Sequence, residues 1–363
     1  MMEVMIDESA KGETAMKDLK SVPNDVLDRR GAPRFGTYRG EFPVVDYERL
    51  SVPERPRWWH WLARRKRWHY TIACTDEVLV GHAVVDGAYF VQSFIYVVDL
   101  YEERAILNRA FTGLPARQGA VNKRPGMGHH SWFRIPGVRF DLSRREGNAS
   151  YRWEGEVHPF LQGERQGMSL EATIAVGEAP ALSVVSPVSG GGMVNTTQKW
   201  VGLPLSGYLR VGSRSYRLDG GTAGVDYTHG LLDRRTAWRW ALAMGRLSDG
   251  RRVGLNLVEG FNDGDDDISE NGLWVGDRFI GLGRAVFEYD RDKPEDEWRV
   301  RTEDGQVDLR FESSHVYRDL RNWGFVDCYF VQPAGRFQGR LQIDGEDHWV
   351  ELTGVTEDQD ICW

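Results

Sequence analysis

Cysteine is scarce in this chain of 363 residues, which contains only Cys74, Cys328 and Cys362. Three cysteines so far apart form neither a disulfide framework nor the closely paired ligands of a zinc site. We therefore expect a reducing, cytoplasmic compartment and no metal centre.

Long apolar runs are missing as well. No stretch reaches the ~20 apolar residues of a membrane span, and the first thirty residues carry charges where a signal peptide has its apolar segment. These absences predict a soluble protein that is not exported and has no stable membrane insertion.

Positive charge is in deficit, with 46 Lys+Arg against 54 Asp+Glu and a formal net charge of −8. Phosphate recognition needs a basic surface, so this balance argues against a nucleic-acid partner. A local aromatic and basic segment runs from Trp58 to Arg67. It indicates either a lid over a ligand cavity, which we favour, or a peripheral membrane contact.

Helical periodicity is sparse, and its best case is residues 56–66, which predict a short helix or the lid itself. The chain instead contains 41 Gly, 14 Trp, 13 Tyr and 15 Phe. Glycine supplies tight turns and aromatic residues favour pleated strands, so this composition predicts an all-β protein with a wide aromatic pocket.

Alternation of apolar and polar residues recurs along the chain. Segments 77–86 and 89–99 alternate on either side of Asp86-Gly87, and segments 237–244 and 253–258 do so on either side of Asp249-Gly250. Aspartate followed by glycine between two such segments is a hairpin signal. The pairs Asp304-Gly305 and Asp344-Gly345 predict two more hairpins, and the whole pattern predicts antiparallel sheets.

A break at Ser189-Gly190-Gly191-Gly192 suggests the domain organisation. We expect a flexible arm over residues 1–33, an N-terminal β domain over 34–195 and a C-terminal lipocalin-like β-barrel domain over 196–363. Closure into barrels or half-barrels removes exposed strand edges, and a barrel of about eight strands can hold one small ligand. Few short helices are expected.

The segment between Gly224 and Gly230 contains the best candidates for acid–base chemistry. Asp226, Tyr227 and His229 lie there, and apolar walls raise the pKa of a carboxyl group. An alternative interpretation is that Asp226 accepts hydrogen bonds from turn amides and that His229 is an ordinary surface residue.

A second polar group consists of Asn256, Glu270 and Asn271. Buried, Glu270 would share proton transfer with Asp226; otherwise it is a strand-edge carboxylate and Asn271 a turn residue. We expect aromatic residues on alternating strand faces to form the wall of the pocket, namely Trp68, Tyr70, Phe94, Tyr96, Trp238 and Trp240.

Other candidate motifs do not match the patterns of known metal, phosphate or nucleophile sites. The acidic run at residues 262–267 lacks the ligand pattern of an EF-hand, and His129-His130 point to opposite faces of a strand. The glycines at 190–192 lack the Lys-Ser/Thr of a phosphate loop, and no GxSxG motif occurs. We expect no cofactor, and we expect His69 to be structural.

Several motifs together resemble the bacterial family called domain of unknown function 2804, over nearly everything after residue 33. They are KRWHYTIAC (66–74), VVDGAYFVQSFIYVVDL (84–100), TQKWVGLPLSGYLRV (197–211), GVDYTHGLLDRRTAWRWA (224–241), RRVGLNLVEG (251–260), ENGLWVGDRFIGLG (270–283) and WRVRTEDGQVDLRF (298–311).

The chain more distantly resembles two-domain lipocalin-like proteins, which include hydroxyneurosporene synthase-type hydratases and fungal decalin-forming cyclases. That resemblance implies two β-barrels or half-barrels around a long apolar substrate. In the hydratases an Asp in an Asp-x-x-Trp-Gly-like motif is tied to alkene protonation. Asp226 matches this Asp, whereas His229 replaces the Trp. The segment Glu357-Asp358-Gln359 has Gln where we expect His in relatives.

Two functions from different classes follow. The first is a cofactor-independent enzyme, a hydratase, isomerase or cyclase, that transfers protons to a hydrophobic isoprenoid- or polyketide-like molecule through Asp226. The second is a lipocalin-like protein that binds a lipid or another hydrophobic ligand without chemistry. The sequence does not fix the oligomeric state.

Overall fold

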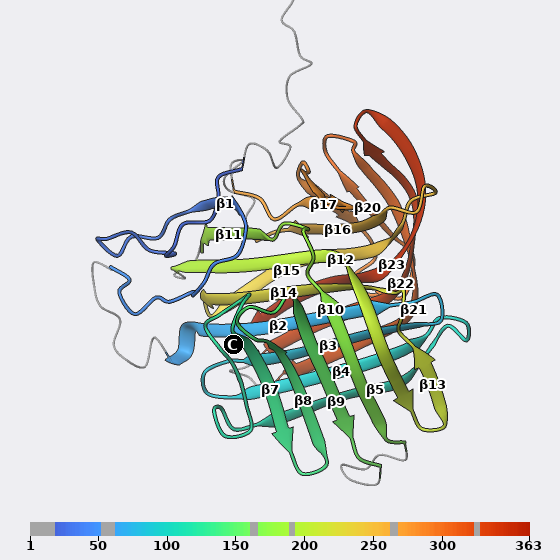
Figure 1. Ribbon diagram of the computed structural model, residues 1–363, viewed down its shortest axis with the longest axis horizontal. Helices are drawn as coiled ribbons and strands as arrows, with labels where there is room; N and C mark the ends of the chain where they lie inside the picture. The colour runs from blue at the N-terminus through green and yellow to red at the C-terminus, as the bar shows by residue number, and fades with distance from the viewer. Residues whose placement is uncertain (1–18, 52–61, 160–165, 189–192, 262–267, 323–326) are drawn as a thin grey trace, which may run out of the picture.

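Antiparallel strands make up most of the computed structural model, which describes residues 19–51, 62–159, 166–188, 193–261, 268–322 and 327–363 (Figure 1). The strands form two antiparallel sheets, one a nearly closed barrel and the other a half-barrel. The predicted all-β fold class is therefore confirmed.

The first sheet has 14 strands, in the order β5-β4-β3-β2-β14-β12-β10-β9-β8-β7-β6, with β1, β11 and β13 attached beside this path. It folds back on itself, so that β6 and β7 pack against β3 and β4. Its strands are β1 (Gly36–Arg39), β2 (Arg65–Cys74), β3 (Val78–Asp86), β4 (Val91–Asp99), β5 (Arg104–Gly113), β6 (Gly119–Val121), β7 (His129–Ile135), β8 (Val138–Arg144), β9 (Ser150–Val157), β10 (Met168–Ala175), β11 (Leu182–Pro187), β12 (Val194–Val211), β13 (Arg214–Arg217) and β14 (Thr222–Leu231).

The second sheet has nine strands, in the order β18-β17-β16-β15-β23-β22-β21-β20-β19. Its strands are β15 (Arg235–Arg246), β16 (Arg252–Glu259), β17 (Gly272–Val275), β18 (Arg278–Gly281), β19 (Ala285–Glu288), β20 (Trp298–Thr302), β21 (Val307–Asn322), β22 (Asp327–Ile343) and β23 (Glu346–Cys362).

The four hairpins predicted from Asp-Gly pairs are present. They join β3 to β4, β15 to β16, β20 to β21 and β22 to β23. The turn glycines Gly250, Gly305 and Gly345 have φ values of 87°, 74° and 79°. Only glycine adopts this left-handed conformation without strain, which is why the hairpin signal could be read from the sequence.

Three apolar layers follow from strand alternation. One fills the first barrel and includes Trp153 and Trp200, and another fills the concave side of the second sheet around Trp298. The third lies between the sheets and includes Tyr70 and Trp240. Successive residues of a strand face opposite sides, so Ala241 and Ala243 face the half-barrel while Trp240 and Leu242 face the first sheet.

The change from one sheet to the other falls at residues 232–234, between β14 and β15. The sequence predicts a boundary near residue 195, which lies in β12, a central strand of the first sheet. The glycine-rich break before β12 interrupts a connection within one sheet and does not separate the two. The register of β12 against β14, from Val194↔Leu231 to Pro204↔Thr222, holds residues 194–231 in the first sheet.

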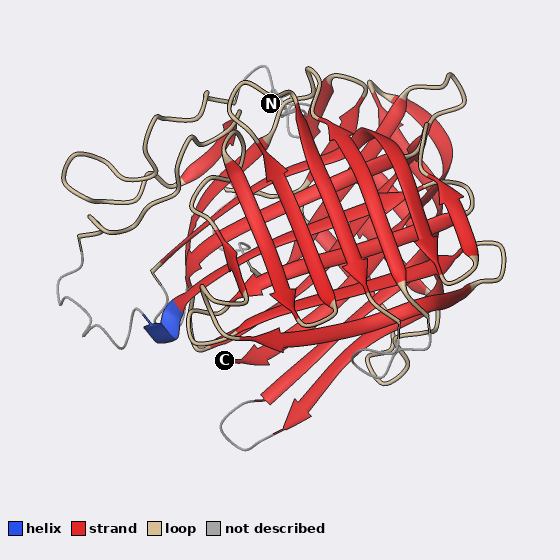
Figure 2. Ribbon diagram, turned by 60° about the horizontal axis from the view of Figure 1, so that its bottom comes forward, coloured by secondary structure: helices blue, strands red, loops and turns tan. Residues whose placement is uncertain are grey.

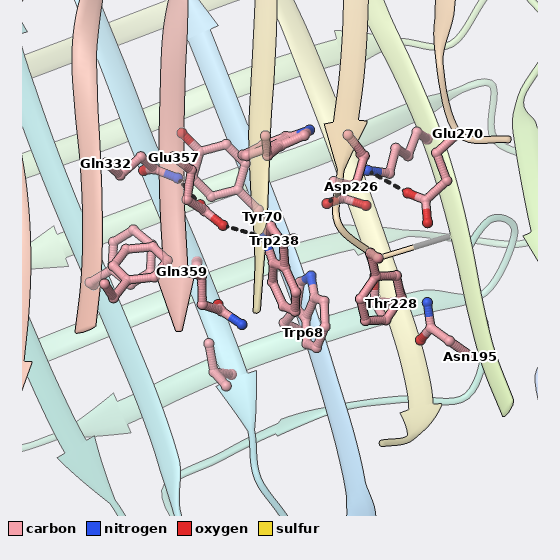
Figure 3. Close-up of a pocket in the computed structure, with 18 of the residues that line it drawn as sticks. Trp68, Tyr70, Asn195, Asp226, Thr228, Trp238, Glu270, Gln332, Glu357 and Gln359 are labelled. Carbon is pink, nitrogen blue, oxygen red and sulfur yellow. Dashed lines mark hydrogen bonds and ion pairs between the residues drawn. The ribbon is translucent and has the colours of Figure 1, made fainter. Parts of the chain in front are cut away.

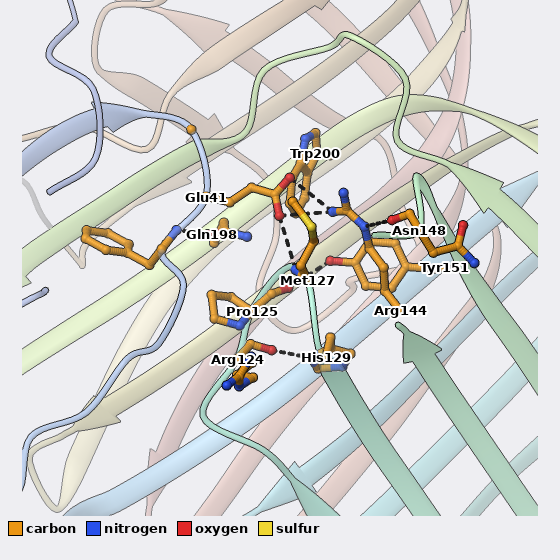
Figure 4. A network of polar contacts seen from close by, with 12 residues as sticks. Glu41, Arg124, Pro125, Met127, His129, Arg144, Asn148, Tyr151, Gln198 and Trp200 are labelled. Carbon is orange, nitrogen blue, oxygen red and sulfur yellow. Dashed lines mark hydrogen bonds and ion pairs between the residues drawn. The ribbon is translucent and has the colours of Figure 1, made fainter. Parts of the chain in front are cut away.

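The predicted flexible arm is corrected over residues 19–33, because Val26 and Leu27 are fully buried in the core of the first barrel. Residues 1–18 lie outside the described part. The following segment is tied down by Glu41, which pairs with Arg144 of β8 at 3.0 Å (Figure 4). The Arg144 side chain is 5% exposed and lies over the rings of Tyr151 and Trp200.

A short helix or a lid was predicted over 56–66; of this segment, the described residues 62–64 form one helical turn, and β2 begins at Arg65 (Figure 2). Residues 52–61, with Trp58 to Trp61, lie outside the described residues. Lys66, from the basic part of this segment, is fully buried and lies over the rings of Tyr89 and Trp363. It therefore presents no charge to a membrane surface.

The two sheets approach each other most closely where β12 meets β16. A Cβ added at Gly254 would lie 2.4 Å from the backbone carbon and oxygen of Val201. Gly202, at a bulge in β12 with φ of +84°, faces the backbone of Val253 and Gly254 from the other side. Glycine at these positions allows backbone-to-backbone packing, which sets the separation of the sheets.

The Gly254→Ala variant is expected to lose about 1–3 kcal/mol of unfolding free energy, because two backbones must separate to admit the methyl group. Gly224→Ala, also between the sheets, is the matched control. Its Cβ would meet only the side chains of Ile72 and Leu242, at 3.2 Å or more, and these can shift. Denaturant unfolding measures both variants, and equal stability losses would contradict the steric argument.

Candidate active site between the sheets

A pocket with a cavity volume of about 90 Å³ opens between the two sheets. One wall comes from strands of the first sheet and the other from strands of the second (Figure 3). The lining residues are Trp68, Tyr70, Ala83, Val85, Phe94, Asn195, Lys199, Asp226, Thr228, Trp238, Trp240, Val258, Phe261, Glu270, Phe330, Gln332, Glu357, Gln359 and Trp363. We call this space the intersheet pocket.

Strand register explains the first wall. Asp226 of β14 lies opposite Lys199 of β12 on one side and Tyr70 of β2 on the other. Residues directly opposite in an antiparallel sheet share a face, so all three side chains point into the pocket.

The predicted partnership of Asp226 with Tyr227 and His229 is wrong. The residues between Gly224 and Gly230 form a strand and not a loop, so Tyr227 and His229 point into the first barrel. There the Tyr227 hydroxyl donates to the Asn122 carbonyl at 3.0 Å, and His229 Nδ1 lies 3.0 Å from the Val45 carbonyl. Burial holds the pKa of His229 well below its usual value. Neither side chain reaches Asp226.

A buried lysine stands in the place expected for those two residues. Lys199 is 4% exposed, and its Nζ lies 3.0 Å from Glu270 Oε2 and 3.6 Å from Asp226 Oδ2. Its ammonium also donates to Asn256 Oδ1 at 3.3 Å. The structure thus brings the predicted residues Asp226 and Glu270 together through a cation that sequence reasoning missed.

Burial raises the pKa of Asp226. Lys199 opposes this shift and Glu270 adds to it, while the Thr197 hydroxyl donates to Asp226 Oδ1 at 3.1 Å. Burial also acts to lower the pKa of Lys199, but the two carboxyl groups outweigh it and raise that pKa. Lys199 therefore stays charged, and Asp226 holds its proton more firmly than an exposed aspartate does.

Glu357 stands on the opposite wall and is 5% exposed. Trp238 Nε1 donates to its Oε1 at 2.8 Å, and Gln332 Nε2 donates to its Oε2 at 2.7 Å. Burial, with a smaller contribution from Asp226, raises the pKa of Glu357 to about 7. No sequence motif predicted a role for Glu357.

The aromatic residues predicted as the wall divide into two groups. Trp68, Tyr70, Phe94, Trp238 and Trp240 line the pocket, and Trp68 stacks on Trp238 with ring centroids 5.7 Å apart. Tyr96 lies behind this wall, with its hydroxyl 2.7 Å from that of Tyr70.

The two predicted asparagines lie behind the lining. The Asn256 side chain accepts hydrogen bonds from Trp240 and Lys199 and donates to the Glu270 carbonyl. Asn271 accepts from the Val258 amide and donates to the Gly283 carbonyl. Both asparagines therefore support the lining residues from outside the pocket.

The remaining candidates lie elsewhere. His69 and His129 face the first barrel, with ring centroids 4.3 Å apart, and burial lowers the pKa of both. No group of three or more His, Cys, Asp or Glu residues in the described ranges is arranged to hold a metal ion. The acidic run at 262–267 lies outside those ranges. The three cysteines are free.

No helix among the described residues is long and apolar enough to cross a membrane.

The nearly closed barrel, the half-barrel and the pocket between them define an all-β protein built from two barrel-like sheets. The pattern of the family described as domain of unknown function (DUF2804) matches residues 17–363, and the chain belongs to that family. No curated protein matches the sequence.

The chain is similar to several solved structures at low sequence identity. CghA, crystallised with Sch210972, superposes with a TM-score of 0.52 at 9% identity, covering 94% of this chain and 97% of CghA. An AttH-like protein from Nitrosomonas europaea gives a TM-score of 0.49 at 14% identity, covering 87% and 98%. Kievitone hydratase from Nectria haematococca gives 0.45 at 11% identity, covering 95% and 98%. The similarity to CghA supports the fold.

Proposed function

We propose that the protein is a cofactor-independent proton-transfer enzyme, a hydratase, isomerase or cyclase, that acts on a hydrophobic isoprenoid- or polyketide-like molecule. The observation that carries this proposal is Asp226, a buried carboxyl group with a raised pKa that faces an aromatic pocket. A carboxyl group that keeps its proton near neutral pH can serve as a general acid.

The neighbours of Asp226 fit this role before and after proton transfer. Burial raises the pKa of the carboxyl group, which favours its protonated, acid form. Once the proton has left, Lys199 at 3.6 Å and the Thr197 hydroxyl at 3.1 Å stabilise the carboxylate. Charge that develops near a fixed cation in a water-poor site is stabilised without reorganisation of the site.

The lining of the pocket selects the substrate class. Most of its residues are aromatic or aliphatic, among them Phe94, Val258, Phe261 and Phe330. The polar lining residues include the carboxyl groups of Asp226, Glu270 and Glu357. Such a site favours an apolar molecule whose reacting carbon lies beside an acid. CghA, which has this fold, was crystallised with Sch210972, so the fold can hold a ligand.

The second candidate is a carrier that holds a hydrophobic ligand and does no chemistry. The ion pair of Lys199 with Glu270 favours it, because a satisfied buried pair can serve structure alone. The two functions differ in one observable, the transfer of a proton to ligand carbon.

Deuterium incorporation separates the two functions. Small molecules released from the purified, denatured protein are identified by mass spectrometry and then incubated with native protein in D₂O. An enzyme of the proposed class puts deuterium on a carbon of this ligand or its product. A ligand that rebinds but gains no deuterium and is not converted would establish the carrier instead.

A further inference from the structure

Glu357 is held in a fixed orientation by a chain of side chains. The Tyr96 hydroxyl donates to Gln332 Oε1 at 2.8 Å, so Tyr96 must accept its bond of 2.7 Å from the Tyr70 hydroxyl. The amide of Gln332, oriented in this way, turns its Nε2 toward Glu357. Trp238, which donates to the other oxygen, is fixed by its stack on Trp68.

These partners also determine where a proton on Glu357 must point. The Trp238 Nε1–H and the Gln332 Nε2–H can only donate hydrogen bonds, so neither accepts one from a protonated carboxyl group. The acidic O–H of Glu357 therefore has no acceptor among its own hydrogen-bond partners. Because Glu357 lines the intersheet pocket, the remaining direction for its proton is the pocket itself.

The ionisable groups that act on Glu357 come from four other strands. They are Asp226 of β14, Lys199 of β12, Tyr70 of β2 and Tyr96 of β4. Tyr70 already donates its hydroxyl proton to Tyr96, and burial raises its pKa well above the usual value. Tyr70 is thus no competing acid, and Glu270, the third carboxyl group of the lining, is paired with the Lys199 ammonium at 3.0 Å. Asp226 and Glu357, on opposite walls, are left as the proton carriers that face a ligand.

We propose that Glu357 is a second catalytic residue of the intersheet pocket, which exchanges a proton with the substrate on the side opposite Asp226. This inference rests on the proposed function and narrows it to reactions that move a double bond, by isomerisation or cyclisation.

The isomerisation balances without any co-reactant. Asp226 gives its carboxyl proton to one carbon of a C=C bond, whose π electrons form the new C–H bond and leave a cationic neighbour. The Glu357 carboxylate then removes a proton from a carbon next to the cation, and that C–H electron pair forms the displaced double bond. Exchange with solvent restores both carboxyl groups to their starting states.

A small apolar diazo compound, phenyldiazomethane, tests whether Glu357 gives a proton to carbon inside the pocket. A protonated carboxyl group transfers its proton to the diazo carbon, dinitrogen leaves, and the carboxylate forms an ester with that carbon. Wild-type protein is treated and its esterified residues are located by peptide mass spectrometry. Glu351, an exposed glutamate on the same strand, serves as the internal control.

We expect esterification of Glu357 to exceed that of Glu351 and to fall about tenfold from pH 6 to pH 8, as the protonated fraction falls around a pKa of about 7. Glu357→Gln should remove the label, and Asp226→Asn should leave it in place. Labelling of Asp226 with Glu357 no more reactive than Glu351 would overturn this inference and spare the proposed function. Deuterium incorporation that fails although Glu357 is labelled would overturn the proposed function, and with it the catalytic role of Glu357.

Discussion

Asparagine in place of Asp226 is expected to lower deuterium incorporation into the pocket ligand by about 10²–10⁴-fold, the usual contribution of a positioned general acid. The change preserves shape and keeps an oxygen that accepts the hydrogen bond from Thr197. It removes the proton that the carboxyl group transfers, because a side-chain amide is not an acid. Ligand affinity should therefore change much less than turnover, and both are measured on the same preparation.

The matched control for this prediction is Asp308→Asn, which neutralises an exposed carboxylate on β21, far from the pocket lining. It should leave turnover unchanged. An Asp226→Asn protein that folds as the wild type and turns over the ligand at the wild-type rate would show that Asp226 is not the acid.

Methionine in place of Lys199 is expected to cost about 3–5 kcal/mol of unfolding free energy at neutral pH, the usual cost of removing one partner from a buried ion pair. Methionine fills similar space but leaves Asp226 and Glu270 without the ammonium that lies 3.6 and 3.0 Å from them. Denaturant unfolding at several pH values measures the loss.

The pH dependence has a definite sign. Lys199 lowers the pKa of Asp226, so its removal raises the folded-state pKa of this carboxyl group further above the unfolded value. A group with a raised folded-state pKa stabilises the protein below its unfolded pKa and loses that contribution as pH rises through the folded-state pKa. The deficit of Lys199→Met should therefore grow from acidic to neutral pH.

A second substitution checks the cause. In the double variant Lys199→Met, Glu270→Gln, one buried negative charge is gone, so part of the lost stability should return. A double variant that is less stable than the single variant would contradict the electrostatic explanation and point to packing around Lys199 instead.

Sequence alone predicted strands and their turns, because strand alternation and turn conformation depend on residues that are close together in the chain. Alternation over residues 237–244 and the glycine after Asp249 were enough to place two strands and their turn. The same alternation predicted which face of β15 carries Trp238 and Trp240. The domain boundary near 195 was wrong because the choice of sheet for β12 depends on its pairing with β14, which sequence spacing does not reveal.

The candidate site was also predicted in part from local sequence and in part missed. Asp226, Glu270 and the aromatic wall were found from their residue types, but Tyr227 and His229 were misassigned because glycines at both ends suggested a loop. Once those residues form a strand, alternate side chains must separate to opposite faces. His229, predicted beside Asp226, instead contacts the carbonyl of Val45 inside the first barrel.

The place of Lys199 and Glu357 in the site could not be predicted without the tertiary structure. A lysine and a glutamate on strands are ordinarily exposed, and what makes these two unusual is that each is covered by the sheet opposite its own. The sequence by itself determined the strands, their turns and the apolar faces that had to be buried. Only the packing of two sheets decided which charged groups share a water-poor space, and that desolvation gives Asp226 and Glu357 their raised pKa values.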